Sequence, residues 1–254
     1  MKFGLIYNTG YYGTDPDQLI AAARHAEACG FESFYLTEHI ALYPGATVGP
    51  VTLPASLPIG DPLECLSFVA AATERILLGT AVLLVPYHHP VILAKRLATL
   101  DVLSKGRMRL LTVGVGALPG EAAAAGVDFA TRGRRADEAI DVLRLLWAGD
   151  ENGVSFDGEF FSFTRLCSFP KPLAPLPVHI GGSEISAFAD RLGLRFARAA
   201  TPGTDPRFVS MITDLVLERT EGGPAMALGS LGTGPDSCPA GCCGTGQSRR
   251  PESR

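Results

Sequence analysis

The stretch Ile76–Gly116 reads ILLGTAVLLVPYHHPVILAKRLATLDVLSKGRMRLLTVGVG, and its pattern decides the fold class. Ile76–Leu84 is a nearly unbroken aliphatic run, which is typical of a strand buried on both faces of a parallel sheet. Apolar residues then recur at helical spacing, at Leu93, Leu97, Leu100 and Leu103. Met108–Val113 is a second aliphatic run, so the stretch predicts a strand–helix–strand unit with two parallel strands.

The helix of this unit is expected to turn its polar side away from the leucines, with Lys95, Arg96 and Asp101 on that side. Lys105-Gly106 ends the helix, because a cation suits its last turn and a glycine suits left-handed backbone.

The alternation of strands and helices extends on both sides of the central unit. Further strands are predicted at 2–7, 34–37 and 177–180, with a weaker one at 194–199. Helices are predicted to follow Asp15 and Asp61, each an N-cap followed by proline, and over 131–147, 184–192 and 205–219. Ser155–Phe163 (SFDGEFFSF) predicts a hairpin. This order indicates an α/β fold.

The last 34 residues differ in composition from the rest. We expect one domain over residues 1–220 and a low-complexity, disordered tail over residues 221–254, which is rich in Gly, Pro and Ser. A closed (β/α) barrel needs eight strands, and this chain offers five firm strands and one or two weak ones.

Composition excludes several classes of partner. The chain of 254 residues carries a net charge of −4 and has no basic stripe, so neither nucleic acid nor an anionic membrane is expected to bind. The N-terminus lacks a signal-peptide pattern, and no apolar run reaches the ~18–20 residues of a membrane span. The six cysteines show no CxxC pairs, so we expect no metal site and a cytoplasmic protein with reduced thiols.

In parallel α/β folds, sites form where the strands end. The segments that stand there are Tyr7-Asn8, Glu38-His39, Thr80-Ala81-Val82, Tyr87-His88-His89, Gly114-Val115-Gly116 and Gly181-Gly182-Ser183. Glu38-His39 suits acid–base chemistry, because a histidine titrates near neutral pH and a carboxylate can orient it. The alternative is a structural pair that holds the long loop Ala41–Gly60.

The remaining segments also allow two interpretations. Gly114, Gly116 and Gly181–Ser183 let backbone approach a ligand or simply form tight turns. His88-His89 lacks the further ligands that a metal requires, so it is interpreted as a polar turn. Arg132, Arg134 and Arg135 cluster at a helix start, which suggests either an anionic partner or a solvated face.

Several motifs together resemble one known family. EACGFESFYLTEH, the whole of Ile76–Gly116, GVDFATRGRRADEAIDVLRLLWAGD, SFDGEFFSF, FPKP and VHIGG occur in the order of the luciferase-like monooxygenase superfamily. They are most similar to its branch of oxidoreductases that use the deazaflavin coenzyme F420. The resemblance covers residues 1 to about 215.

The resemblance implies a (β/α)8 TIM-type barrel with insertions that binds F420, or alternatively FMN, and often forms a homodimer. Glu38 and His39 match the acidic–His pair beside the cofactor ring. Thr80, Ala81 and Val82 match the strand behind the ring, with a non-proline cis peptide at Ala81-Val82. Gly114 and Gly116 would approach the ring or ribityl chain, and Gly181, Gly182 and Ser183 would hold the tail phosphate.

Two departures qualify the resemblance. Gly181-Gly182-Ser183-Glu184 is one residue shorter than the family's phosphate loop, and the Gly/Pro/Cys-rich tail replaces the last strands, so we expect a barrel incomplete at its C-terminus.

The expected activity is hydride transfer between F420 and a small organic substrate, with His39 as proton donor. An FMN-dependent monooxygenase and a truncated, non-catalytic relative are the alternatives. A sugar-phosphate aldolase would need a lysine at a strand end, and none is found there.

Overall fold

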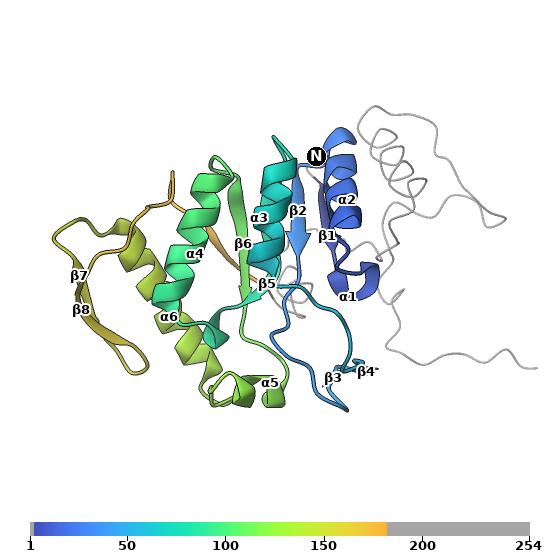
Figure 1. The fold of residues 1–254 in the computed structure, drawn as a ribbon. Helices are drawn as coiled ribbons and strands as arrows, with labels where there is room; N and C mark the ends of the chain where they lie inside the picture. The colour runs from blue at the N-terminus through green and yellow to red at the C-terminus, as the bar shows by residue number, and fades with distance from the viewer. Residues whose placement is uncertain (1–2, 182–254) are drawn as a thin grey trace, which may run out of the picture. The chain divides into compact units, whose positions relative to one another are not determined.

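The computed structural model describes residues 3–181, which contain a five-stranded parallel sheet (Figure 1). Its strands, in spatial order, are β1 (Gly4–Tyr7), β2 (Ser33–Leu36), β5 (Leu77–Leu84), β6 (Met108–Gly114) and β9 (Val178–Ile180). Every neighbouring pair is parallel, which confirms the predicted α/β class and the unit built from β5 and β6.

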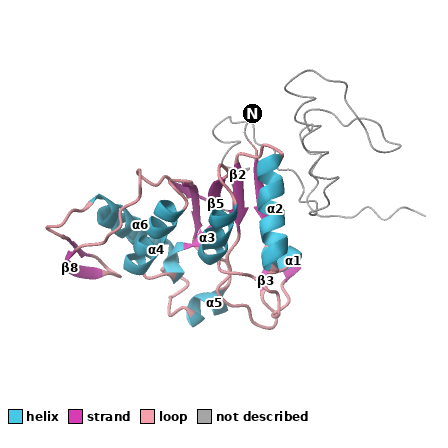
Figure 2. Ribbon diagram, turned by 45° about the horizontal axis from the view of Figure 1, so that its top comes forward, coloured by secondary structure: helices cyan, strands magenta, loops and turns pink. Residues whose placement is uncertain are grey.

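Four longer helices connect these strands: α2 (Pro16–Ala28), α3 (Pro62–Ala72), α4 (Pro90–Leu103) and α6 (Arg132–Ala148). Helices α2, α3 and α4 stand on the same side of the sheet in both views (Figures 1 and 2). Asp15 and Asp61 cap α2 and α3 as predicted, since their carboxylates accept backbone N–H groups of the first turn.

The polar face predicted for α4 is partly wrong. Asp101 is completely buried and Leu103 is 65% exposed. Asp101 follows the buried Ala94 by seven residues, about two helical turns, so it lies on the inner face. One oxygen of its carboxylate, Oδ2, accepts hydrogen bonds from Arg109 Nη2 at 3.1 Å and from the N–H of Leu173 at 2.8 Å. The other, Oδ1, lies 3.0 Å from Arg109 Nη2 in an ion pair.

The long loop 41–60 contains a small antiparallel pair, β3 (Thr47–Val48) and β4 (Val51–Thr52). Two short helices that the sequence pattern did not predict, α1 (Thr9–Tyr12) and α5 (Pro119–Ala124), hold the loop. The N–H of Gly60 donates to Thr9 Oγ1 at 2.9 Å, and the N–H of Gly120 donates to the Tyr43 hydroxyl at 3.4 Å. The loop is therefore anchored near both of its ends.

The predicted hairpin is confirmed as β7 (Val154–Asp157) and β8 (Ser162–Leu166), which form a separate two-stranded sheet. Its turn depends on a residue of α6. Both carboxylate oxygens of Glu138 face the turn, and they accept the N–H groups of Glu159 at 2.9 Å, Phe160 at 2.9 Å and Phe161 at 2.7 Å.

Several expectations lie outside the described residues. These are the elements predicted at 184–192, 194–199 and 205–219, the boundary at residue 220, and the tail over residues 221–254. Within residues 3–181, no helix has both the length and the apolar character to span a membrane.

Candidate active site

The ends of the parallel strands gather the predicted site residues at one edge of the sheet. In Figure 1 this is the lower edge, where the arrow of β2 points and beyond which α5 and the β3–β4 pair lie. The register pairs Leu36 with Thr80, so Glu38-His39, which follow the end of β2, come level with the last residues of β5. Parallel strands bring their C-terminal ends together in this way.

Glu38 pairs with His88 rather than with His39. Its carboxylate accepts the N–H of Leu84 at 2.5 Å through Oε2, and Oε1 lies 2.9 Å from His88 Nε2. The Glu38 side chain is only 3% exposed. The expectation that Glu38 orients His39 is therefore wrong, because successive residues of an extended chain point in opposite directions.

His39 has a different carboxylate partner, Glu121 of α5. Its Nδ1 lies 3.1 Å from Oε2 and 3.3 Å from Oε1 of Glu121. Glu121 also accepts the N–H of Ile40 at 2.5 Å and the N–H of Ala41 at 3.3 Å. The Glu121 side chain is fully buried and the His39 side chain is 21% exposed, so the imidazole is buried on one side and accessible on the other.

Two glutamate–histidine pairs thus stand side by side, and sequence reasoning missed one residue of each. His88 was interpreted as a polar turn, yet it is a partner of Glu38. Glu121 was not singled out at all, although it is the lone acidic residue in the alanine-rich segment 117–126. A buried charge in such a segment is a usable signal, since glutamate is rarely buried without a partner.

The peptide bond between Ala81 and Val82 is cis, as the family resemblance implied. The side chain of Val82 lies between Gly114 and Gly181. A Cβ built on Gly114 would approach Val82 Cγ2 to 2.5 Å, and one built on Gly181 would collide with Val82 Cγ1. These two glycines therefore make room for Val82, which forms an apolar wall at the ends of β5, β6 and β9.

The side chain of Thr80 forms hydrogen bonds within the sheet. It is fully buried, and its hydroxyl donates to the carbonyl of Thr112 at 2.7 Å while accepting the N–H of Thr112 at 3.1 Å. The hydroxyl thus bridges β5 and β6 just before the register shifts, and the geometry favours this structural role over the predicted cofactor contact.

Gly116 faces the phenol of Tyr87. It has φ +80°, and an added Cβ would collide with the Tyr87 hydroxyl. Among the described residues that hydroxyl has no hydrogen-bond partner, although the side chain is only 9% exposed. Burial, followed by the negative charge of Glu121, raises the pKa of Tyr87, and Arg132 opposes the shift. Tyr87 stays a neutral phenol at neutral pH.

The arginine cluster at the start of α6 has partners within the chain, and only Arg134 of the three is exposed as a solvated face requires. Arg132 lies over the Phe129 ring at 3.6 Å and donates to the carbonyls of Phe129 and Gly116. Arg134 pairs with Glu159 at 2.9 Å in an exposed salt bridge. Arg135 donates to the carbonyl of Pro86 at 3.0 Å and lies over Phe161 at 4.5 Å.

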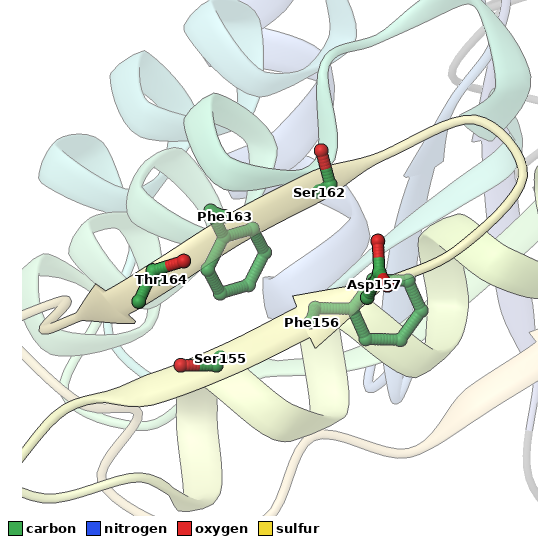
Figure 3. A pocket seen from close by; sticks show the side chains of 6 residues that line it. All are labelled: Ser155, Phe156, Asp157, Ser162, Phe163 and Thr164. Carbon is green, nitrogen blue, oxygen red and sulfur yellow. The ribbon is translucent and has the colours of Figure 1, made fainter.

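A hollow of about 480 Å³ lies along the β7–β8 hairpin and not at the strand ends. Figure 3 shows the rings of Phe156 and Phe163 on the neighbouring strands, and their centroids are 6.1 Å apart. All of its lining residues belong to the hairpin: Ser155, Phe156, Asp157, Ser162, Phe163 and Thr164. It contains neither of the two glutamate–histidine pairs, so we place the candidate site at the strand ends.

Two predicted site residues, Gly182 and Ser183, lie outside the described residues, so the predicted phosphate loop is described only as far as Gly181. No group of three or more His, Cys, Asp or Glu side chains is placed to hold a metal within residues 3–181.

Parallel strands joined by helices, with polar pairs at the C-terminal ends of the strands, are the arrangement of the (β/α) barrel class. Within that class the chain belongs to the luciferase-like monooxygenase family, whose sequence profile matches residues 1–201. A monooxygenase from Streptomyces bottropensis has a similar fold, with a TM-score of 0.60 and 25% identity over 86% of this chain and 65% of that one.

Two relatives were found by sequence similarity. An uncharacterized protein of Mycobacterium bovis is 38% identical over 191 residues, which cover 72% of this chain and 66% of that protein. An F420-dependent glucose-6-phosphate dehydrogenase of Beutenbergia cavernae is 35% identical over 199 residues, covering 75% of this chain and 54% of that enzyme. The chain thus spans between about half and two thirds of the length of these relatives.

Proposed function

We propose that this protein is an F420-dependent oxidoreductase that transfers a hydride between the deazaflavin and a small organic substrate. The observation that carries the proposal is the placement of His39, whose accessible imidazole is held by buried Glu121 just beyond the C-terminal end of β2 in the parallel sheet. The identity of 35% to an F420-dependent dehydrogenase supports F420 as the cofactor.

The wall at the strand ends suits a planar ring. Val82 is apolar and half-buried, and the flanking Gly114 and Gly181 add no side chains around it. Ala81, Val82, Gly114 and Gly116 would lie along the ring and ribityl chain, and Gly181, Gly182 and Ser183 would bind the phosphate. When bound, F420 donates or accepts the hydride.

The chain itself supplies proton transfer and shielding. His39 gives or takes a proton through Nε2, because its Nδ1 is occupied by Glu121. The anchored loop 41–60 keeps water from the reacting groups. Glu38, held by His88 and the N–H of Leu84, keeps the ends of β2 and β5 together and so supports the wall.

An FMN-dependent monooxygenase is the second candidate, and the fold shared with the Streptomyces bottropensis monooxygenase favours it. The same wall and the same histidine would then face a flavin. For either cofactor we propose a cytoplasmic homodimer, with neither nucleic acid nor membrane as a partner.

The test is a titration of the purified protein with F420 and, separately, with FMN, followed by fluorescence quenching. Saturable binding of F420 but not FMN supports the proposal. Binding of FMN alone overturns it in favour of the second candidate, and binding of neither overturns both.

The role of His39 is tested by His39→Ala, in which turnover should fall by about 10²–10⁴-fold while cofactor affinity changes little. His25→Ala, which removes an exposed histidine from α2, is the matched control and should leave turnover unchanged. Unchanged turnover in a folded His39→Ala protein removes His39 from the mechanism.

A further inference from the structure

We propose that Glu121 is a positioning residue that fixes His39 in the tautomer with its proton on Nδ1, and that it links this tautomer to the anchored start of the loop 41–60. The inference rests on the proposed function, in which His39 transfers a proton.

The contacts of Glu121 divide between its two carboxylate oxygens. Oε1 receives the N–H of Ile40 at 2.5 Å and the N–H of Ala41 at 3.3 Å. Oε2 is the oxygen nearer to His39 Nδ1, at 3.1 Å. The side chain that makes these contacts is fully buried. A buried carboxylate with three donors around it is fixed in position.

The tautomer follows from the chemistry of these groups. An ionised carboxylate can only accept hydrogen bonds, so His39 Nδ1 must donate to Glu121. In the neutral ring the other nitrogen, Nε2, then carries a lone pair and can accept a proton from a substrate or return one to it. The opposite tautomer would turn the lone pair of Nδ1 toward the carboxylate.

The same carboxylate joins the ring to the loop. Ile40 and Ala41 open the loop, and Gly120, the residue before Glu121, donates to the hydroxyl of Tyr43 in the loop. A shift of the loop start relative to α5 must therefore move the acceptor of His39 as well. The position of the loop start and the orientation of the ring are therefore coupled through this one side chain.

Glu121→Gln should change the proton position on His39 while it keeps the contacts of Glu121 with the loop, because two N–H groups donate to Oε1. The amide oxygen must stay opposite Ile40 and Ala41, since an NH₂ group there would face two donors. The NH₂ group then takes the place of Oε2, the nearer of the two atoms to His39 Nδ1 (3.1 Å against 3.3 Å for Oε1), so we expect Nδ1 to become an acceptor. The substitution should move the ring proton from Nδ1 to Nε2 with little change in shape.

The Glu38–His88 pair provides a matched control. One oxygen of Glu38 receives the N–H of Leu84 and the other lies beside His88 Nε2, so Glu38→Gln should switch the tautomer of His88 instead. Both carboxylates are buried and both pair with a histidine. The two variants therefore differ chiefly in which histidine ring loses its carboxylate partner: His39 in Glu121→Gln and His88 in Glu38→Gln.

The experiment is ¹⁵N NMR of the ring nitrogens of the full chain, labelled at histidine, at about pH 8, where an ordinary histidine is neutral. The five histidines are assigned by single substitution. We expect His39 to show a protonated Nδ1 in the wild type and a protonated Nε2 in Glu121→Gln. In Glu38→Gln the His39 signals should stay unchanged. With F420 bound, turnover of Glu121→Gln should fall at least about tenfold with KM nearly unchanged, a smaller loss than the 10²–10⁴-fold of removing an acid–base group.

Two outcomes overturn the inference: a protonated Nε2 or a mixture of tautomers in the wild type, which requires no variant, or an unchanged tautomer in folded Glu121→Gln. Either leaves the proposed cofactor chemistry standing, because F420 binding is measured separately. A switched tautomer with unchanged turnover would instead refute the role of His39 in the proposed function.

Discussion

Nε2 of His88 lies 2.9 Å from Oε1 of Glu38, and this contact joins the segments that follow two neighbouring parallel strands. The Glu38 side chain is 3% exposed and the His88 side chain 14%. Solvent therefore has little access to the Glu38 carboxylate, and water would replace a lost hydrogen bond from His88 only poorly.

His88→Ala should destabilise the fold by about 1–3 kcal/mol, because it leaves one oxygen of a buried carboxylate without its hydrogen bond. The measurement is chemical denaturation, with the free energy of unfolding compared with that of the wild type. His89→Ala is the control, since His89 is exposed and its ring makes an edge-to-face contact with Phe161, with centroids 5.6 Å apart. Equal losses in the two variants would show that the Glu38–His88 contact contributes nothing specific.

Gly116→Ala should cost more stability than Gly126→Ala. Both glycines have positive φ, +80° and +71°, so both substitutions carry the left-handed backbone cost of about 1–2 kcal/mol. Only at Gly116 would the new methyl group also collide with another side chain, the phenol of Tyr87, whereas Gly126 has nothing within 4 Å.

The added cost at Gly116 is checked by combining Gly116→Ala with Tyr87→Phe. Removing the hydroxyl relieves the nearest collision, so thermal unfolding should show part of the stability restored. If the double variant is no more stable than the sum of the single changes predicts, the collision with the hydroxyl is not the cause.

The loss of folding stability as the pH falls below neutral should depend in part on Glu27. Its partial burial by itself raises the pKa, but hydrogen bonds from the N–H groups of Glu74 and Arg75, with the charge of Arg75, lower the pKa below its ordinary value of 4.5. A lowered pKa in the folded state means that this stabilisation is fully present above pH 4.5 and is lost as pH falls through the folded pKa.

Denaturation midpoints measured from neutral pH downward test this directly. The wild type should lose stability below pH 4.5, and Glu27→Gln should show a shallower fall in the same window. Glu151→Gln, which changes an exposed glutamate, should keep the wild-type slope. If the stability of Glu27→Gln falls with pH as steeply as that of the wild type, Glu27 is not the source of the acid sensitivity.

Local chemistry made much of the fold predictable. Asp15 and Asp61 cap helices through residues two or three positions away, and β5 and β6 are aliphatic because both of their faces are covered. Asp101 was misplaced because its charge suggested an outer face, whereas its partners Arg109 and Leu173 lie beyond the helix. A charged residue can thus occupy the buried face of a helix when partners distant in the sequence bind it.

The candidate site was predictable only in part, for the same reason. The strand ends marked Glu38 and His39, but their partners are separated from them by 50 and 82 residues along the chain. Glu38 and His39 are adjacent, which suggested that they pair with each other. Because the backbone is extended there, each residue instead pairs with a distant partner, Glu38 with His88 and His39 with Glu121. Glu121 lies on a short helix in a segment of alanines, so no periodic pattern predicted that its carboxylate would reach the strand ends.

The tip of the β7–β8 hairpin takes its shape from outside its own sequence. Because Glu138 binds three successive backbone N–H groups there, the side chains of the tip are not needed to make the turn. New side chains could be grafted at Glu159 and Phe160 while the bend persists, provided that proline, which has no N–H, is avoided. The residue that fixes this turn, Glu138, belongs to α6 and not to the hairpin. Side chains at the tip can therefore be changed, in evolution or by engineering, without loss of the contacts that hold the turn.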